Sequence, residues 1–418
     1  MNRADGRDHP NGGGLNRADG GGLNRADGGG LNRPVGYFVH HQGRGHAERA
    51  AAIVHALPAD RAVTLFCARD DIFPPLPRNA DIVRIPSLFE ATAPAPAALG
   101  GVRTPSTLHC APLGWDGITQ AVATITRWFA QAAPALFVTD VSAELAQLAR
   151  IASVPCVPVL QHGDRDDPGH IAAYEGAVGI LAPYASALEQ PGRPHWMTRR
   201  IFHAGGLGVE VSTIRRSDAR DALGLSHDAD IVLVVAGGGG EGTPAPPLTL
   251  GARADPDSLW ITIGEVAHAW HETAPANLVH RGWVADPARW IAAADRVVSS
   301  AGNTTVHMIA AAGRPWVVVP EWRYFAEQSW KARMLDTAGA AAVCDHWPAS
   351  AAAWAQAWQR ARAIDPARQA ALVDAQAAAR TADWIEGLIA QYWGSPAAPT
   401  APIAGMPLAP IIVEERAQ

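Results

Sequence analysis

The sequence predicts an α/β protein with two doubly wound domains. Short apolar runs alternate with segments of helical periodicity, a pattern typical of βαβ units and mostly parallel sheets. These runs form two series, which a polar stretch around residues 211–230 separates. The length of 418 residues also exceeds that of one typical domain. We therefore expect two sheets, each covered by helices, rather than one.

The first series begins with the apolar run Val35–Val39, which predicts a strand. A glycine turn and a helix follow, and Ala50, Ile53, Val54 and Leu57 have the spacing of one apolar helix face. A further helix is expected over Ser142–Ala152. The other predicted strands of this series are Val63–Cys67, Leu136–Thr139, Cys156–Leu160 and Val178–Leu181.

The second series begins with Ile231–Val235, and its runs are apolar enough to be buried on both faces. Its other predicted strands are Trp260–Ile263, Asn277–His280, Arg296–Ser299 and Trp316–Val319. The Ala/Trp-rich stretch Ala351–Trp393 is predicted to be wholly helical and to close the fold. These patterns give an N-terminal domain over 34–210, a C-terminal domain over 211–350 and closing helices over 351–394.

Both ends of the chain have compositions that oppose folding. An eight-residue unit occurs at Leu15–Gly22 and again at Leu23–Gly30, with much glycine and little apolar surface. Ordering such a segment costs more conformational entropy than its burial can offset, so we expect residues 1–33 to be a disordered, low-complexity leader. Residues 395–418 are rich in Pro and Ala and are predicted to be a tail.

Composition excludes several classes of protein. Hydrophobic residues make up 48% and charged residues 18%, and the formal net charge of −6 argues against a nucleic-acid partner. No run approaches the roughly 18 apolar residues of a transmembrane segment. The four cysteines lie far apart without a C-x-x-C pair, which argues against structural zinc and disulfides. We expect a cytoplasmic protein with reduced thiols.

The turn after the first predicted strand contains Gly43, Gly45 and His46. Glycines there let the backbone approach a ligand, and the helix start offers free N–H groups to an anion. The dinucleotide-binding fingerprint is excluded, because its third glycine would fall at Glu48. His46 is placed to take a proton near neutral pH. The alternative, a helix-terminal histidine bonded to backbone, fits its position equally well.

A run of four glycines follows the first strand of the second series. Gly237 and Gly238 are the candidate residues of this run for close approach to a diphosphate. The alternative is a flexible turn without a ligand.

A second turn compatible with phosphate lies within Gly282–Ala341, between a strand and a helix start over Ser299–Thr305. Glu327 and Gln328 follow the next strand at the same sheet edge, where they could hold hydroxyl groups.

The order and spacing of these segments resemble the GT-B glycosyltransferases, which have two Rossmann-like domains facing a cleft. The closest likeness is to glycosyltransferase family 28, which includes the lipid-intermediate N-acetylglucosaminyltransferase of peptidoglycan synthesis. The resemblance covers roughly residues 34–345 and is most specific from Gly282 to Ala341.

The resemblance implies an acceptor-side N-terminal domain and a C-terminal domain that binds a nucleotide-diphosphate sugar. It implies that His46 deprotonates the acceptor beside Gly43 and Gly45. Its donor-binding positions fall on Trp283, Val284, Gly302, Asn303, Thr304, Thr305, Glu327 and Gln328. One departure is Met308, which stands where family 28 has a carboxylate for the ribose hydroxyls.

Asp140 and His162 follow strands of the first series and are the remaining candidates for the acceptor cleft. The acceptor itself, a small molecule, peptide or lipid, has no recognisable motif, and a lipid acceptor would require contact with a membrane surface. We expect neither a cofactor nor a metal. Asp164 and Asp166 resemble the metal-binding Asp-x-Asp of the other major glycosyltransferase fold, but the architecture around them differs from that fold.

The predicted function is an inverting, metal-independent glycosyltransferase of the hexosyltransferase type. A catalytically silent sugar-nucleotide-binding or scaffold protein is one alternative, which Met308 favours and the intact glycine–histidine turn opposes. A nucleotide-sugar epimerase is another alternative, for which the sequence offers no additional acid and base residues around the sugar.

Overall fold

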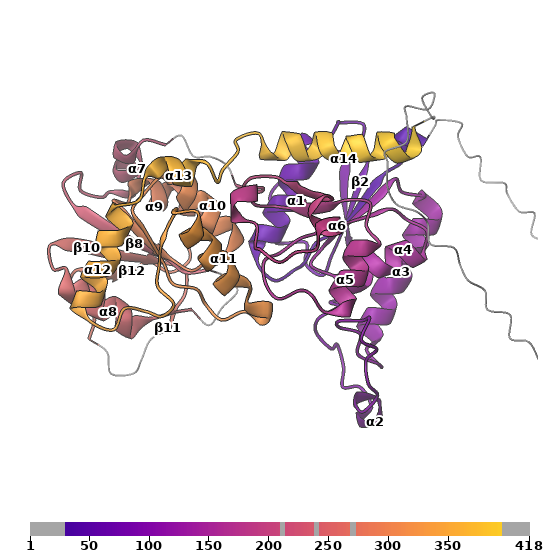
Figure 1. Ribbon diagram of the computed structural model, residues 1–418, viewed down its shortest axis with the longest axis horizontal. Coiled ribbons are helices and arrows are strands. Elements are labelled where there is room, and N and C mark those ends of the chain that lie inside the picture. The colour runs from indigo at the N-terminus through magenta and orange to yellow at the C-terminus, as the bar shows by residue number, and fades with distance from the viewer. Residues whose placement is uncertain (1–29, 210–213, 238–241, 268–272, 395–418) are drawn as a thin grey trace, which may run out of the picture.

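The computed structural model describes residues 30–209, 214–237, 242–267 and 273–394, and Figure 1 shows two α/β bodies side by side. The first sheet has seven strands in the order β3-β2-β1-β4-β5-β6-β7. The second has six strands in the order β12-β10-β8-β13-β14-β15, and a separate small sheet pairs β11 with β9. All recorded strand pairs are parallel. The predicted fold class, two doubly wound domains, is therefore confirmed.

The strands of the first sheet are β1 (Val35–Phe38), β2 (Val63–Cys67), β3 (Ala80–Arg84), β4 (Leu136–Asp140), β5 (Cys156–Val159), β6 (Ile180–Ala182) and β7 (Ile201–His203). The helices of this half are η1 (Gly30–Asn32), α1 (Arg44–Ala56), α2 (Ala97–Gly100), α3 (Asp116–Ala132), α4 (Ala143–Ile151), α5 (Pro168–Glu175), η2 (Ser186–Leu188) and α6 (His195–Thr198).

The central strands of this sheet are buried on both faces, as their unbroken apolar runs predict. Successive side chains of β1 point to opposite faces, so Tyr37 joins the core under α1 while Phe38 joins the core under α3 and α4. The edge strand β3 was not predicted from the sequence. Its side chains are half-buried or exposed, so it carries no continuous apolar run.

The strands of the second half are β8 (Asp230–Val235), β9 (Thr243–Pro244), β10 (Ser258–Ile263), β11 (Val266–Ala267), β12 (Leu278–His280), β13 (Arg296–Ser299), β14 (Trp316–Val318) and β15 (Ala342–Val343). Its helices are α7 (Arg216–Leu223), α8 (Ala245–Ala254), α9 (Pro287–Ala293), α10 (Asn303–Ala312), η3 (Tyr324–Ala326) and α11 (Glu327–Thr337).

The C-terminal stretch is not wholly helical, which corrects the sequence prediction. It forms three helices, α12 (Ala351–Arg362), α13 (Pro366–Ala370) and α14 (Ala377–Trp393). The break after α12 has a local cause, because Asp365 caps the next helix through the N–H of Ala367 and Pro366 begins it. Trp354 and Trp358 of α12 pack in the core of the second sheet, whereas α14 returns to the first domain and lies against α1.

The last residues of the predicted leader belong to the fold. Gly30–Asn32 form a 3₁₀ helix beside α14, and the guanidinium of Arg33 lies 3.8 Å from the centre of the Trp393 ring. Residues 1–29 of the predicted leader and the tail 395–418 lie outside the described residues.

The chain crosses between the two sheets twice. It passes from the first sheet to the second between β7 and α7, and it returns between α13 and α14. The two connections lie side by side, because the N–H of Asp374 in the second donates to the carbonyl of Gly205 in the first at 2.7 Å.

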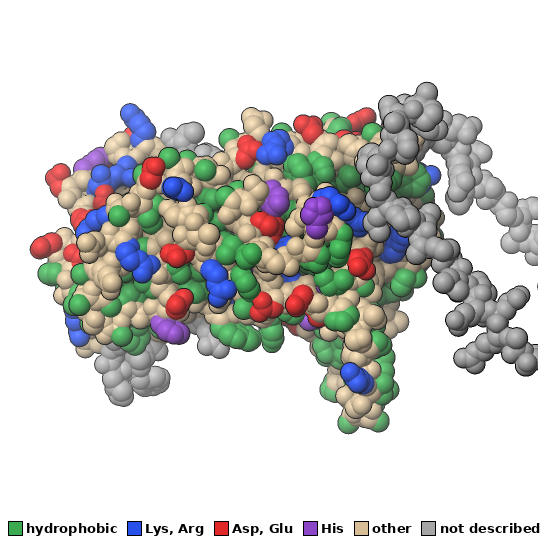
Figure 2. Space-filling view, viewed as in Figure 1, with side chains coloured by type: hydrophobic (Ala, Val, Ile, Leu, Met, Phe, Trp, Pro, Cys, Tyr) green, Lys and Arg blue, Asp and Glu red, His purple; other side chains and the backbone are tan. Residues whose placement is uncertain are grey.

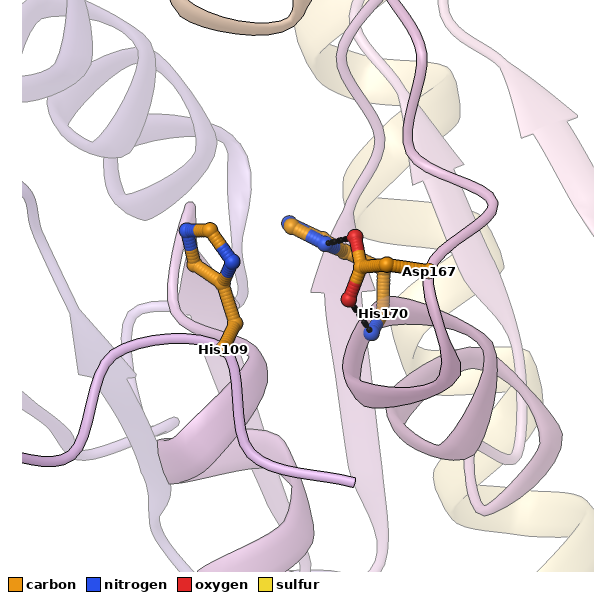
Figure 3. Close-up of side chains that lie close together, drawn as sticks. All are labelled: His109, Asp167 and His170. Atoms are coloured by element: carbon orange, nitrogen blue, oxygen red, sulfur yellow. Dashed lines mark hydrogen bonds and ion pairs between the residues drawn. The ribbon is translucent and has the colours of Figure 1, made fainter. Parts of the chain in front are cut away.

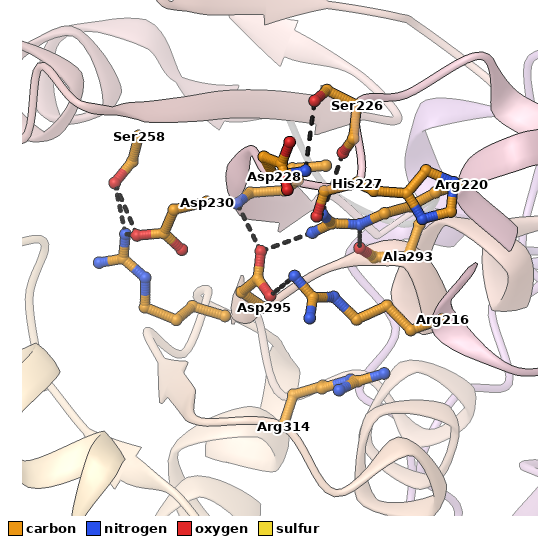
Figure 4. Close-up of polar contacts among 12 residues, drawn as sticks. Arg216, Arg220, Ser226, His227, Asp228, Asp230, Ser258, Ala293, Asp295 and Arg314 are labelled. Carbon is orange, nitrogen blue, oxygen red and sulfur yellow. Dashed lines mark hydrogen bonds and ion pairs between the residues drawn. The ribbon is translucent and has the colours of Figure 1, made fainter.

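A polar network fixes the edge of the second sheet at which its strands begin (Figure 4). The buried guanidinium of Arg220 on α7 donates to Oδ2 of Asp295 at 2.6 Å and to the carbonyls of Ala293, Ser226 and His227. Asp295 also pairs with Arg216 at 2.5 Å. The network therefore anchors α7 at the edge opposite the carboxyl ends of the strands.

The segment between β3 and α3 projects from the first domain, with α2 at its tip (Figures 1 and 2). None of the helices in the described ranges combines the length and the apolar character needed to cross a lipid bilayer. All four cysteines are free thiols.

Candidate active site

The glycine turn at the start of α1 lies directly against the turn at the start of α10. Gly43 has φ 91°, a conformation that favours glycine, and precedes α1. A methyl group on Gly45 would collide with Oγ1 of Thr304, so a larger residue would require this hydroxyl to move while the two turns touch. The two segments that the sequence singles out in different domains therefore meet at the carboxyl ends of both sheets.

His46 faces a buried carboxylate rather than backbone. Its Nδ1 lies 3.1 Å from Oδ2 of Asp140, the last residue of β4, and 20% of the His46 side chain is exposed whereas none of Asp140 is. A proton on Nδ1 would face this carboxylate and leave Nε2 to accept one. The structure places Asp140 behind His46, which corrects the expectation that it lines the acceptor cleft.

Arg49 completes this arrangement from the next turn of α1. Its Nε lies 3.6 Å from Oδ2 of Asp140, and its side chain is 3% exposed. Burial alone would raise the pKa of Asp140, but the charge of Arg49, together with His46, holds that pKa below its usual value. Asp140 is therefore ionised at neutral pH. Sequence reasoning missed Arg49, although a charged residue on the apolar face of a predicted helix is a signal.

A pocket of about 510 Å³ lies at the carboxyl ends of β1, β2 and β3. Its wall includes His41, Arg69, Arg84 and Glu90. The ring of His40 lies near both this pocket and the base, with its centre 5.3 Å from that of His46 and 5.4 Å from that of the pocket residue His41. Burial, and next the neighbouring His46, lower the pKa of His40 to about 3, so the ring is neutral.

The start of α10 provides the anion-compatible turn of the second domain. Gly302 is the N-cap, and Asn303, Thr304 and Thr305 form the first turn, where backbone N–H groups lack intrahelical acceptors. Nδ2 of Asn303 donates to Oε1 of Gln161 across the domain boundary at 2.5 Å. Gly237 faces this turn, because a Cβ on it would lie 3.5 Å from Oγ of Ser300. Gly238 lies outside the described residues.

The three residues expected near the nucleoside differ in exposure. Trp283 is 65% exposed, so its indole ring is free to stack on a ligand. Val284 and Met308 are half-buried and pack against the core of the second domain.

Glu327 and Gln328, expected to contact the sugar, already have protein partners. Oε1 of Gln328 accepts from the N–H groups of Ala301 at 3.0 Å and Glu321 at 2.9 Å, which leaves its NH₂ group for a ligand. Oε2 of Glu327 accepts from Nη2 of Arg165 in the first domain at 3.3 Å. Gln328 therefore holds the segment before α10 in place, and the role of both residues toward a sugar stays a prediction.

His162 is not brought to the cleft surface, contrary to the sequence expectation. Its side chain is entirely buried, and its ring packs 4.1 Å from the ring centre of Tyr184. Nε2 is bonded to the carbonyl of Leu188 at 2.6 Å. Burial lowers the pKa of His162 well below its ordinary value, so it is a neutral core histidine.

The loop that follows His162 contacts the second domain instead. The N–H of Asp164 donates to the carbonyl of Phe325 at 2.7 Å, and Oδ1 of Asp164 accepts from Nε1 of Trp330 at 2.6 Å. The guanidinium of Arg165 lies 4.7 Å from the centre of the Phe325 ring. Asp164 is thus an interdomain contact.

Within the described ranges, one cluster has the residue types of a metal site: His109, Asp167 and His170 (Figure 3). Its ligand atoms lie within 4.8 Å of one another. However, both ring nitrogens of His170 are already engaged, Nδ1 by Asp167 at 2.5 Å and Nε2 by the guanidinium of Arg165 at 3.2 Å. A cation bound there would meet the positive charge of Arg165, so the geometry favours a hydrogen-bonded network.

Solved structures with this arrangement of two sheets are glycosyltransferases. The calicheamicin glycosyltransferase CalG4 superposes with a TM-score of 0.56 and 16% identity, over 86% of this chain and 99% of that one. MurG of Acinetobacter baumannii superposes with a TM-score of 0.54 and 17% identity, over 85% and 99%. The chain has the GT-B fold. At these identities, the superpositions establish the fold of this GT-B chain but not its activity or its substrates.

Curated relatives match part of this GT-B chain in sequence. The UDP-N-acetylglucosamine–N-acetylmuramyl-(pentapeptide) pyrophosphoryl-undecaprenol N-acetylglucosamine transferase of Yersinia pestis is 30% identical over 161 residues. This match covers 36% of the chain and 45% of the relative, so it spans less than half of the relative's length. The expected resemblance to family 28 is confirmed over that part. No protein-family model matches the chain.

Proposed function

We propose that this GT-B protein is an inverting glycosyltransferase that moves a sugar from a nucleotide-diphosphate sugar to an acceptor hydroxyl. The observation that carries the proposal is the His46–Asp140 pair, which lies beside the turn at the start of α10. A base held by a buried carboxylate and an anion-compatible helix start from the other domain are the two groups that such a transfer needs.

His46 acts as the base in this proposal. Its Nε2 takes the proton of the acceptor hydroxyl while the acceptor oxygen forms a bond to C1 of the sugar. The bond from C1 to the diphosphate oxygen breaks in the same displacement, and the nucleoside diphosphate leaves from the opposite face. A single displacement of this kind inverts the configuration at C1. Asp140 stabilises the imidazolium that forms, as a buried carboxylate does for a catalytic histidine.

The departing diphosphate gains negative charge, and the α10 turn is placed to stabilise it. Backbone N–H groups at a helix start and the positive end of the helix dipole favour such an anion. Arg49 and Lys331 add buried positive charge around this turn. We propose that these groups do without a metal what a divalent cation does in other transferases.

The acceptor side of the proposal rests on the pocket at the ends of β1, β2 and β3. A hydroxyl group reaching from this pocket toward His46 passes His40, which is neutral and stacks on Phe89 with ring centres 4.4 Å apart. The pocket wall carries both charged and apolar residues, so an acceptor with a polar portion suits it.

A thermal-shift screen over nucleoside diphosphates and their sugars tests the donor half of the proposal, since selective binding stabilises the native state. Transfer is then assayed with the stabilising donor over a panel of acceptor alcohols, with EDTA as the test for metal independence. Inverted product formed in EDTA supports the proposal. Binding without transfer to any acceptor, or hydrolysis of the donor, would favour the silent sugar-nucleotide-binding protein, and an epimerised donor would favour the epimerase.

A further inference from the structure

Lys331 is the single lysine of the chain. Lysine and arginine together number 34, and all the others are arginine. It lies on α11, and none of its side chain is exposed. Fully buried lysines are rare unless they are paired, because removing an ammonium from water is costly. A lysine buried at this one position therefore indicates a specific role for its ammonium group.

The partner of this ammonium is an amide rather than a carboxylate. Nζ donates to Oδ1 of Asn303, the first residue of α10. Within the described part of the chain, Lys331 has no ion-pair partner. The carboxylate of Glu327, which faces Lys331 from its own helix, is already paired with Arg165.

The other groups around Lys331 increase the excess of positive charge. Arg49 and Arg165 face it from the first domain, and the neutral rings of His162 and His307 face it from the loop after β5 and from α10. Burial lowers the pKa of Lys331 to about 8, and Glu327 opposes that shift. An anion at the start of α10 would relieve both the repulsion and the lost hydration.

Asn303 connects this charge to the anion-compatible turn. Its Oδ1 accepts from Lys331, and its Nδ2 donates to Gln161 of the first domain at 2.5 Å. Both sides of the amide are thereby fixed, which orients the first turn of α10 and its N–H groups. Lys331 is buried away from bulk solvent, so its charge acts on that turn with little screening.

We infer that Lys331 is a positioning residue for the donor diphosphate: its ammonium holds Asn303 at the start of α10 and supplies the charge that the bound diphosphate neutralises. This inference rests on the proposed function, in which that turn binds the diphosphate. The competing interpretation is that Lys331 only links α11 to α10 through Asn303 and does not affect ligand binding.

The first experiment compares uridine diphosphate with uridine, which lacks the diphosphate, by calorimetric titration. We expect Lys331→Met to weaken uridine diphosphate binding by about tenfold or more, as the loss of one charge-assisted contact does, and uridine binding by less than about twofold. Arg333→Met is the matched control, since it removes a positive charge from the exposed face of the same helix. Equal losses for both ligands, or no loss for either, would overturn the inference.

A second experiment needs no variant and so does not depend on Lys331→Met folding. Lysine labelled with ¹³C at Cε gives one signal in this chain, whose pH titration follows Lys331 directly. Because binding and protonation are linked reciprocally, uridine diphosphate should raise the pKa of Lys331, whereas uridine should not. Correspondingly, uridine diphosphate affinity should fall as pH rises through 8 and above, and this fall should vanish in Lys331→Met.

The proposed function and the role of Lys331 are overturned by different results. If the wild-type protein binds none of the nucleoside diphosphates in the screen, the proposed function is overturned and this inference with it. If the wild-type protein binds a nucleoside diphosphate and the Lys331 signal titrates identically with and without that ligand, only the role of Lys331 is overturned.

Discussion

Nδ1 of His46 lies 3.1 Å from Oδ2 of Asp140, and the two residues come from different elements, the first helix and the end of β4. The pairing places a buried counter-charge behind a partly exposed imidazole. This property does not belong to His46 alone, since it requires β1 and β4 to be neighbours in the sheet.

Replacing the base should remove turnover and leave the fold intact. We expect His46→Ala to lower kcat by roughly a hundredfold or more, the usual loss for a general base, with little change in donor affinity. The check is a kinetic assay with an identified acceptor, alongside calorimetric titration of the nucleoside diphosphate. Wild-type turnover in this variant would exclude His46 as the base.

Replacing the carboxylate behind the base should lower kcat by less than replacing His46 itself. Asp140→Asn keeps the size of the side chain but removes the charge that stabilises the imidazolium, so kcat should fall by at least about tenfold at neutral pH. Donor affinity should be unchanged, because Asp140 is buried behind His46. An unaltered kcat would show that His46 works without its partner.

The donor preference should follow from Met308. Its thioether is a weak acceptor and forms no strong hydrogen bond with the 2′-hydroxyl of a ribose. We therefore expect the affinities for uridine and deoxythymidine diphosphates to lie within tenfold of each other, or the deoxy form to bind more tightly. Met308→Glu should shift the ratio toward the ribose form. Calorimetric titration of both ligands decides this, and a hundredfold preference of the wild type for uridine diphosphate would refute it.

Stability should fall as the pH is lowered below 6.5. Burial lowers the pKa of His40 and of His307 to about 3 from an ordinary value of 6.5. Between these values the unfolded chain binds protons that the folded chain does not, so each ring removes up to ~1.4 kcal/mol of unfolding free energy per pH unit as the pH falls. Urea unfolding at pH 6.5 and 5 should reveal this slope.

The matched variants for this test are His307→Gln and His195→Gln. The first removes a buried ring and should flatten the slope, whereas the second removes an exposed ring and should leave it as it is. A slope that is the same in both variants would contradict the assignment to the buried ring.

The network around Arg220 should be a major source of stability in the second domain. Arg220→Met leaves the carbonyls of Ala293, Ser226 and His227 without their donor and should cost about 3 kcal/mol. Arg216→Met removes a more exposed partner of the same Asp295 and should cost less than about 1 kcal/mol. Chemical denaturation of the two variants measures the difference, and equal losses would count against the network.

The sequence predicted most of the strands that are buried on both faces, because such strands are continuous apolar runs. It missed β3 and β7, whose side chains are half-buried or exposed, and the two-residue strands β9, β11 and β15. It also treated Ala351–Trp393 as wholly helical, although capping by Asp365 and the turn before α14 interrupt the helices there. Local patterns thus located the strongly apolar elements and left three of the four edge strands of the two large sheets, β3, β7 and β15, undetermined.

The candidate site was predictable where it lies on glycine turns and helix starts. Long-range pairing was not: nothing in the sequence places Asp140 behind His46, turns His162 into the core or occupies the amide oxygen of Gln328 with two backbone N–H groups. These outcomes depend on which strands are neighbours and on how the two domains meet.

The two connections between the domains meet at Gly205 and Asp374. A rotation of one domain about this point would separate Gly45 from Thr304 and break the contact between Asn303 and Gln161. In the proposed function, the same rotation would open the α10 turn to the donor diphosphate.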